Sequence, residues 1–236
     1  TAHNWLGLDH AALIDVIKIM EVSLKSVEDL FDISIHDALE ADGVLSQAKE
    51  LLMIHNLARM KELEEKSQRD GLTGAYNRMY FDETLRHEFN LATQYHLPLT
   101  IAIIDLDHFK RVNDTHGHLA GDSLLVTVVK NVCAQIRQDD TLSRYGGEEF
   151  ALILPGTTLE ASRNLIARLK EAITEIAYEL DDSCIIQITA SIGVAAYHEG
   201  STTFNEPLDM IKAADSALYA AKHAGRNRIV EWNSLL

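Results

Sequence analysis

From residue 70 onward, the chain alternates between short apolar runs of strand length and longer windows in which apolar residues recur at helical spacing. Strands are expected at Leu99–Asp105, Thr141–Tyr145, Glu149–Leu154, Ile185–Ala196 and Arg228–Trp232. Helices are expected at Phe81–Tyr95, Leu119–Ile136, Leu159–Tyr178 and Leu208–His223. Because each helix must bury one apolar side, this order predicts an α+β or α/β domain with helices packed against a central sheet.

The preceding segment has helical patterns only, which predicts an all-α extension. Residues 1–43 form its first part and end at Asp42-Gly43, where glycine interrupts the pattern. Residues 44–69 contain neither Gly nor Pro and are expected to form one linker helix. Residues near heptad spacing in this helix are Val44, Ala48, Leu51, His55 and Ala58. The pattern fits a coiled coil or, because the last two turns are mostly charged, a solvated linker helix.

Charge and cysteine content argue against several classes of protein. The 36 acidic residues outnumber the 21 basic ones, and a net charge of −15 opposes broad binding to nucleic acid or to an anionic membrane. No apolar stretch approaches the roughly 20 residues that span a bilayer. The 2 cysteines lie far apart without CxxC spacing, which is typical of a cytoplasmic protein without disulfide bonds or structural zinc. A polyanionic ligand would need a metal ion or a local group of cations.

Two carboxylates, Asp105 and Asp107, follow the first predicted strand. At the end of a strand their side chains leave the core, and carboxylate oxygens are ligands that Mg²⁺ prefers. The pair therefore predicts a metal site, although solvated acids would explain these two residues taken alone.

The segment Arg144–Phe150 places two glycines between predicted strands, where they suit a two-residue hairpin turn. Glu148 and Glu149 follow directly. On neighbouring strands their carboxylates would meet that of Asp105, and a turn without side chains would let a bulky ligand approach the backbone.

The polar segment Phe109–Asp122 lies directly after the first predicted strand. It contains Asn and Asp side chains, which can accept hydrogen bonds from the N1 and N2 donors of guanine. Adenine offers no such pair of donors on that edge, so the segment favours a guanine nucleotide.

In order and spacing, these motifs resemble the GGDEF family of diguanylate cyclases, with the variant signature Gly146-Gly-Glu-Glu-Phe150. Three more motifs agree: Asp70–Arg78 resembles DxLTGxxNR, Asp105–Asp114 resembles DxDxFKxxND, and Ala221–Asn227 resembles AKxxGRN. The similarity covers about residues 70–232, and four motifs in register make it specific.

The resemblance implies that residues 70–236 form a palm-like α+β domain, similar to those of polymerases and nucleotide cyclases. It implies a nucleotidyltransferase that condenses two GTP molecules into cyclic di-GMP and releases two pyrophosphates. The implied cofactor is Mg²⁺, with Mn²⁺ as a substitute. Because each domain would hold one GTP, catalysis would need a homodimer, with neither nucleic acid nor membrane as a partner.

Site residues are carried over by position. The resemblance assigns metal binding to Asp105, the backbone carbonyl of Leu106, Glu148 and Glu149. It assigns guanine binding to Asn113 and Asp122, and binding of the terminal phosphates to Lys222 and Arg226. Lys110 would offset charge that develops on the phosphate, and Glu148 would accept the proton of the 3′-hydroxyl, with an ionised water as the alternative acceptor.

The family's RxxD motif for inhibition by the product matches Arg137-Gln-Asp-Asp140, and Arg168 matches a second arginine of that site. A surface ion pair is the alternative interpretation of RxxD. The alternative function is an inactive receptor for GTP or cyclic di-GMP, although the carboxylates that such members lose are present here. The stretch Asn4–Leu8 and the following helices resemble the segment after an HDOD-type regulatory domain.

Overall fold

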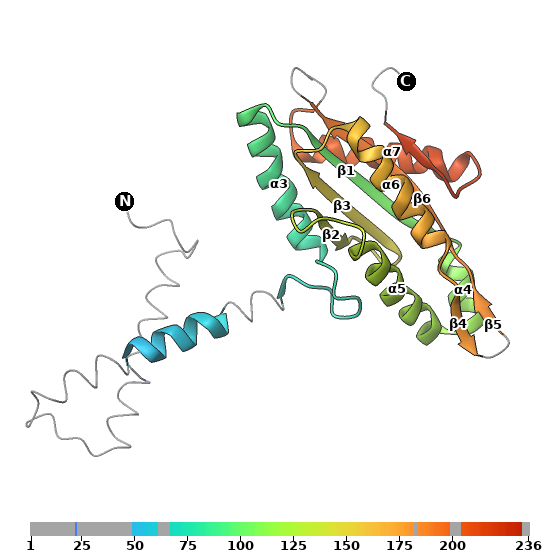
Figure 1. The fold of residues 1–236 in the computed structure, drawn as a ribbon, viewed down its shortest axis with the longest axis horizontal. Helices are drawn as coiled ribbons and strands as arrows, with labels where there is room; N and C mark the ends of the chain where they lie inside the picture. Colours follow the sequence, from blue (N-terminus) through green and yellow to red (C-terminus); the bar gives the residue numbers. More distant parts are fainter. Residues whose placement is uncertain (1–21, 23–48, 61–66, 182–183, 199–203, 233–236) are drawn as a thin grey trace, which may run out of the picture. The chain divides into compact units, whose positions relative to one another are not determined.

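The computed structural model describes residues 22, 49–60, 67–181, 184–198 and 204–232. The chain divides into two compact units, residues 1–62 and residues 63–236, and each is described by itself. In the second unit helices flank a five-stranded sheet, which confirms the predicted α+β fold (Figure 1).

The second unit is built around the central strand β1. Its elements are α3 (Arg78–Tyr95), β1 (Leu99–Asp107), α4 (Phe109–His116), α5 (His118–Cys133), β2 (Thr141–Arg144), β3 (Glu149–Pro155), α6 (Leu159–Thr174), β4 (Tyr178–Asp181), β5 (Cys184–Ile186), β6 (Thr189–Tyr197), α7 (Pro207–His223) and β7 (Ile229–Glu231). The main sheet has the order β2-β3-β1-β6-β7, and only the β6-β7 pair is parallel. Strands β4 and β5 form a separate two-stranded sheet. Strand β1 is therefore paired on both sides.

Two apolar cores lie on the two faces of this sheet. Ile101 and Ile103 of β1 belong to the core that includes residues of α3 and α7. Ala102, Ile104 and Leu106 belong to the other core, with residues of α5 and α6. Because side chains alternate along a strand, Asp105 and Asp107 point to the face that α3 and α7 cover.

Helix α7 packs very closely on β6, and Gly193 makes this possible. A Cβ atom at Gly193 would lie 2.1 Å from the backbone oxygen of Ala214 and 2.3 Å from the backbone nitrogen of Leu218. Only a residue without a side chain fits there. This contact fixes the height of α7 above the sheet and thereby the position of its last turn.

Three predicted elements differ in detail. The polar segment after β1 forms a helix, α4, which the buried ring of Phe109 anchors to the core despite its polar composition. Helix α6 ends at Thr174, so Tyr178 belongs to β4 instead of the predicted helix. The strand predicted at Ile185–Ala196 is divided into β5 and β6, because β5 pairs with β4 and β6 pairs with β1.

Only part of the predicted all-α extension falls on described residues. Residues 49–60 are helical, as expected, whereas residues 1–43, including the stretch that resembles an HDOD tail, lie outside the described residues except for Val22. The linker helix predicted through Arg69 ends earlier, since Gln68 is in a turn and Arg69 forms an isolated bridge with Tyr76. Among the described residues, no helix has both the length and the apolar character needed to cross a membrane.

Candidate active site

The end of β1 meets the signature segment in the sheet. In the register, Asp105 lies opposite Glu149 of β3 and opposite Ser191 of β6. The backbone nitrogen of Leu106 donates a hydrogen bond of 3.2 Å to the carbonyl of Glu148. The residues predicted to bind metal therefore lie together at the junction of β1 and β3.

The ammonium group of Lys222 lies on the Asp105 carboxylate, with 2.7 Å between Nζ and Oδ2. Burial raises the pKa of Asp105 above its ordinary value, an effect that the Lys222 charge opposes and the nearby Asp107 reinforces. The resemblance to the GGDEF family assigns Lys222 to the terminal phosphates. In the structure its charge compensates the carboxylate of the predicted metal site.

The electrostatics at the end of β1 favour an additional cation. Burial raises the pKa of Glu148, the charge of Asp105 raises it further, Lys222 opposes the shift, and Glu149 adds to it. Within the described ranges, no cluster of three or more His, Cys, Asp or Glu side chains is arranged to hold a metal ion. The oxygen donors and the cation held at Asp105 fit a hard divalent ion, whose other ligands would come from water and substrate phosphates.

The turn between β2 and β3 differs from the predicted two-residue hairpin. Strand β2 ends at Arg144 and β3 begins at Glu149, so residues 145–148 connect them. A two-residue turn of the common hairpin type requires a positive φ at Gly, and neither Gly146 nor Gly147 has one. A Cβ at Gly146 would lie 2.7 Å from the Glu149 carboxylate, a contact that rotation of the flexible Glu149 side chain would relieve.

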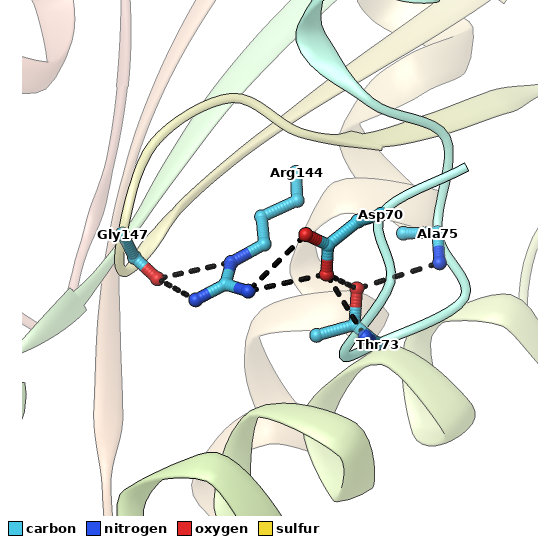
Figure 2. Close-up of polar contacts among 5 residues, drawn as sticks. All are labelled: Asp70, Thr73, Ala75, Arg144 and Gly147. Atoms are coloured by element: carbon cyan, nitrogen blue, oxygen red, sulfur yellow. Dashed lines mark hydrogen bonds and ion pairs between the residues drawn. The ribbon is translucent and has the colours of Figure 1, made fainter. Parts of the chain in front are cut away.

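Arg144 connects this turn to the loop that precedes α3, a role that sequence reasoning missed (Figure 2). Its Nη2 donates to the carbonyl of Gly147 at 2.8 Å, and its Nη1 lies 3.1 Å from Asp70 Oδ1. Asp70 also accepts hydrogen bonds from the backbone nitrogen and the hydroxyl of Thr73. Burial opposes ionisation of Asp70, but these bonds outweigh it and lower the pKa of Asp70.

Asp107, the second acid of the β1 end, has no contact with the signature turn among the hydrogen bonds found for the described residues. It is 5% exposed and accepts hydrogen bonds of 2.7 Å from the hydroxyls of Thr189 and Ser191 on β6. Its Oδ2 also accepts a bond of 3.0 Å from the backbone nitrogen of Asn227, after α7. Because Asp107 lies two residues after Asp105 on β1, the sequence indicates that both side chains lie on the same face of the sheet. It does not indicate which residues bond to Asp107.

The residues predicted to bind guanine lie on α4 and α5. Asn113 of α4 is half-buried, and its Oδ1 has no hydrogen-bond partner. A Cβ at Gly121 of α5 would lie 1.9 Å from this oxygen, so the neighbouring Asp122 belongs to a turn that closely approaches Asn113. Lys110 is exposed on α4. The structure thus brings the two predicted guanine-binding positions together across the α4–α5 junction.

The segment after α7 has an unusual backbone. Gly225, Arg226 and Asn227 have φ values of 108°, 62° and 48°, all in the region that disfavours residues with a Cβ. The backbone nitrogen of Arg226 donates to the carbonyl of Ala221 at 3.1 Å. The exposed Arg226 side chain is therefore carried by a tightly defined turn directly after α7, the helix that carries Lys222.

The predicted inhibition site lies at the other end of α5. The Asp140 carboxylate accepts a hydrogen bond of 2.8 Å from the backbone nitrogen of Arg137, and burial raises the pKa of Asp140 despite this bond. Arg168 of α6 donates to the carbonyl of Gln135 at 2.9 Å. All three predicted residues thus lie around one turn, and the part of α5 from Asp122 to Cys133 separates this turn from Asp122 by about 17 Å.

Comparison with known proteins assigns this domain to a class. Residues 67–228 match the family described as diguanylate cyclase, GGDEF domain, and the chain belongs to this family. It is 38% identical over 168 residues to the probable diguanylate cyclase DgcC of Escherichia coli K12, covering 71% of this chain and 44% of that protein. It is 39% identical over 173 residues to the diguanylate cyclase DgcP of Pseudomonas aeruginosa PAO1, covering 73% of this chain and 25% of that protein. The chain thus spans less than half the length of either relative.

Solved structures agree with the assignment. The coiled coil and GGDEF domain of DgcB from Caulobacter crescentus, in complex with c-di-GMP, superposes with a TM-score of 0.70 at 28% identity, covering 82% of this chain and 99% of that one. The diguanylate cyclase SiaD of Pseudomonas aeruginosa, in complex with its activator SiaC, gives a TM-score of 0.66 at 31% identity, covering 94% and 88%.

Proposed function

We propose that this chain is a diguanylate cyclase that converts two GTP molecules into cyclic di-GMP and two pyrophosphates. The observation that carries the proposal is the meeting of Asp105, Glu148 and Lys222 at the end of β1, in a domain whose family includes diguanylate cyclases. In each transfer, the 3′-oxygen of one GTP bonds to the α-phosphorus of the other. The bond from that phosphorus to the β-phosphate oxygen breaks, and the second transfer closes the ring.

Asp105, the carbonyl of Leu106, Glu148 and Glu149 would hold Mg²⁺, with Mn²⁺ as a substitute. When bound, the metal polarises the α-phosphate and stabilises the leaving pyrophosphate. The contact between Lys222 and Asp105 supports this role, because it marks a position where the carboxylate accepts a cation. Lys222 would leave Asp105 when the substrate complex forms and would then bind the terminal phosphates.

The remaining groups have complementary roles. Asn113 and Asp122 would accept hydrogen bonds from guanine, and the unpartnered Asn113 oxygen supports this assignment. Arg226 would contact the terminal phosphates, and Lys110 would offset charge on the reacting phosphate. Glu148 is the proposed acceptor of the 3′-hydroxyl proton, with an ionised water as the alternative.

Catalysis would require two copies of the chain, because one domain holds one GTP. The helix at residues 49–60 supports this requirement, since Leu51, Ile54 and Leu57 are 68%, 57% and 43% exposed. At 100° per residue, these side chains and Ala58 share one side of the helix, whereas His55 lies away from its centre. The proposed dimer contact therefore runs along this apolar side.

Product inhibition is proposed at Arg137, Asp140 and Arg168. The two guanidinium groups would bind phosphate and stack on guanine, and Asp140 would accept from a guanine edge. Their grouping around one turn, at the end of α5 remote from Asp122, supports a site that acts without displacing GTP.

The test is chromatography of the products formed from GTP and Mg²⁺ by the parent chain, by Asp105→Asn and Glu148→Gln, and by Glu171→Gln. Glu171 is an exposed acid on α6, so its variant controls for loss of one charge. We expect cyclic di-GMP from the parent and the control, and at least a hundredfold slower turnover in the other two. Tight binding of GTP or cyclic di-GMP without any product, at concentrations where dimers are present, would instead establish the receptor function.

A further inference from the structure

Asp107 is a buried carboxylate that the proposed reaction leaves without a role. It accepts three hydrogen bonds, from two hydroxyls of β6 and from one backbone nitrogen beyond α7. A carboxylate removed from water is costly unless its oxygens are paired. Its three donors come from segments more than 80 residues away in the sequence, so Asp107 joins β1 to two distant parts of the chain.

The backbone nitrogen that Asp107 holds belongs to a segment with an uncommon conformation. Arg226 and Asn227 both have positive φ values, directly after Gly225. This region disfavours Arg and is tolerated better by Asn, so contacts around the turn must help to hold Arg226 there. The hydrogen bond from the Asn227 nitrogen to Asp107 Oδ2 is such a contact, because it ties the turn to the end of β1.

We infer that Asp107 is the positioning residue of the phosphate-binding turn: it fixes the backbone at Asn227 so that Arg226 faces the terminal phosphates of GTP. This inference rests on the proposed contact of Arg226 with those phosphates. Thr189 and Ser191 take part indirectly, because their hydroxyls hold the Asp107 carboxylate in the orientation that the Asn227 nitrogen requires.

The hydrogen-bond chemistry distinguishes positioning from a purely electrostatic role. In Asp107→Asn, the amide oxygen still accepts from Asn227, and the amide nitrogen donates to the Ser191 hydroxyl, which can rotate to accept. In Asp107→Ser, the shorter side chain cannot accept the hydrogen bond from the Asn227 backbone nitrogen. A positioning role therefore predicts that Asn preserves function and Ser does not, whereas a role of the charge predicts that both variants fail.

The experiment measures the KM for GTP and the inhibition constant of GMP for the parent, Asp107→Asn and Asp107→Ser, each with and without Arg226→Ala. We expect Asp107→Ser to raise the KM for GTP about tenfold. This corresponds to about 1.4 kcal/mol, the size expected when Arg226 loses a charge-assisted contact with the phosphates. The inhibition constant of GMP, which has no terminal phosphates, stays unchanged. Asp107→Asn stays within about threefold of the parent, and the Ser effect disappears in the Arg226→Ala background.

Several results would overturn the inference: equal weakening of GTP and GMP, effects that add to those of Arg226→Ala, equal loss in the Asn and Ser variants, or no change. If Arg226→Ala alone leaves the KM for GTP unchanged, the proposed phosphate contact is wrong. If neither the parent nor any variant forms cyclic di-GMP, the proposed activity itself is wrong. Should Asp107→Ser not fold, Thr189→Val must show a smaller loss confined to GTP, and a Thr189→Val protein like the parent refutes the positioning role.

Discussion

Replacement of Gly193 by alanine tests how closely α7 must lie on the sheet. The new Cβ would meet the backbone oxygen of Ala214 at 2.1 Å and the backbone nitrogen of Leu218 at 2.3 Å. These atoms belong to a helix backbone and cannot rotate away, so α7 must move by about 1.3 Å to restore ordinary contact. Overpacking costs about 1–3 kcal/mol, and we expect a loss of stability near 3 kcal/mol.

The assay is equilibrium unfolding in urea, followed by circular dichroism, together with thermal unfolding. For a domain of this size, a loss of about 3 kcal/mol lowers Tm by roughly 6–12 °C. Gly71→Ala is the matched control, because a Cβ there meets nothing within 4 Å. We expect the control to stay within about 1 kcal/mol of the parent. A Gly193→Ala protein that is equally stable would refute the close-packing argument.

Three more changes test separate contacts. Hydrogen bonds lower the pKa of Asp70, so its ionised form stabilises the fold above about pH 4. The Tm of the parent should therefore exceed that of Asp70→Asn at neutral pH, and this difference should shrink as the pH falls below about 4. Arg137→Ala should keep basal turnover but lose noncompetitive inhibition by cyclic di-GMP; inhibition equal to the parent's would contradict the RxxD assignment. The double variant Ile54→Glu with Leu57→Glu should abolish dimers in sedimentation and lower turnover at least tenfold. Arg59→Glu, on the other side of the helix, should change neither. Unchanged sedimentation of the double variant would exclude this helix as the dimer contact.

The sequence predicted which residues meet at the β1 end but not how their charges are compensated. Asp105 and Glu148 were expected together because each borders a predicted strand, and the register confirms this. The contact of Lys222 with Asp105 depends on where the last turn of α7 comes to rest. That position is set by packing at Gly193; a glycine inside a strand can mark a close backbone approach, but the sequence does not say which helix approaches it.

Other differences follow from tertiary contacts that override local patterns. The composition of α4 is mostly polar, yet the buried ring of Phe109 and the partly buried Val112 dock it on the core. Tyr178 continues the helical pattern of α6, but its pairing with Ile186 places it in β4. The bonds of Asp107 join residues more than 80 positions apart and therefore leave no local signal.

The parallel pairing of β6 with β7 affects the order in which the site can form during synthesis. Strand β7 follows the Arg226 turn and joins the sheet beside β6, with α7 as the crossover between them. A nascent chain that has emerged only as far as residue 220 already contains Asp105, Glu148 and Asn113. It lacks Lys222, the turn at Arg226 and the strand that closes the sheet edge. Lys222 and Arg226, the groups proposed to bind the terminal phosphates, are thus the last part of the site to leave the ribosome, and an unfinished domain lacks both of them.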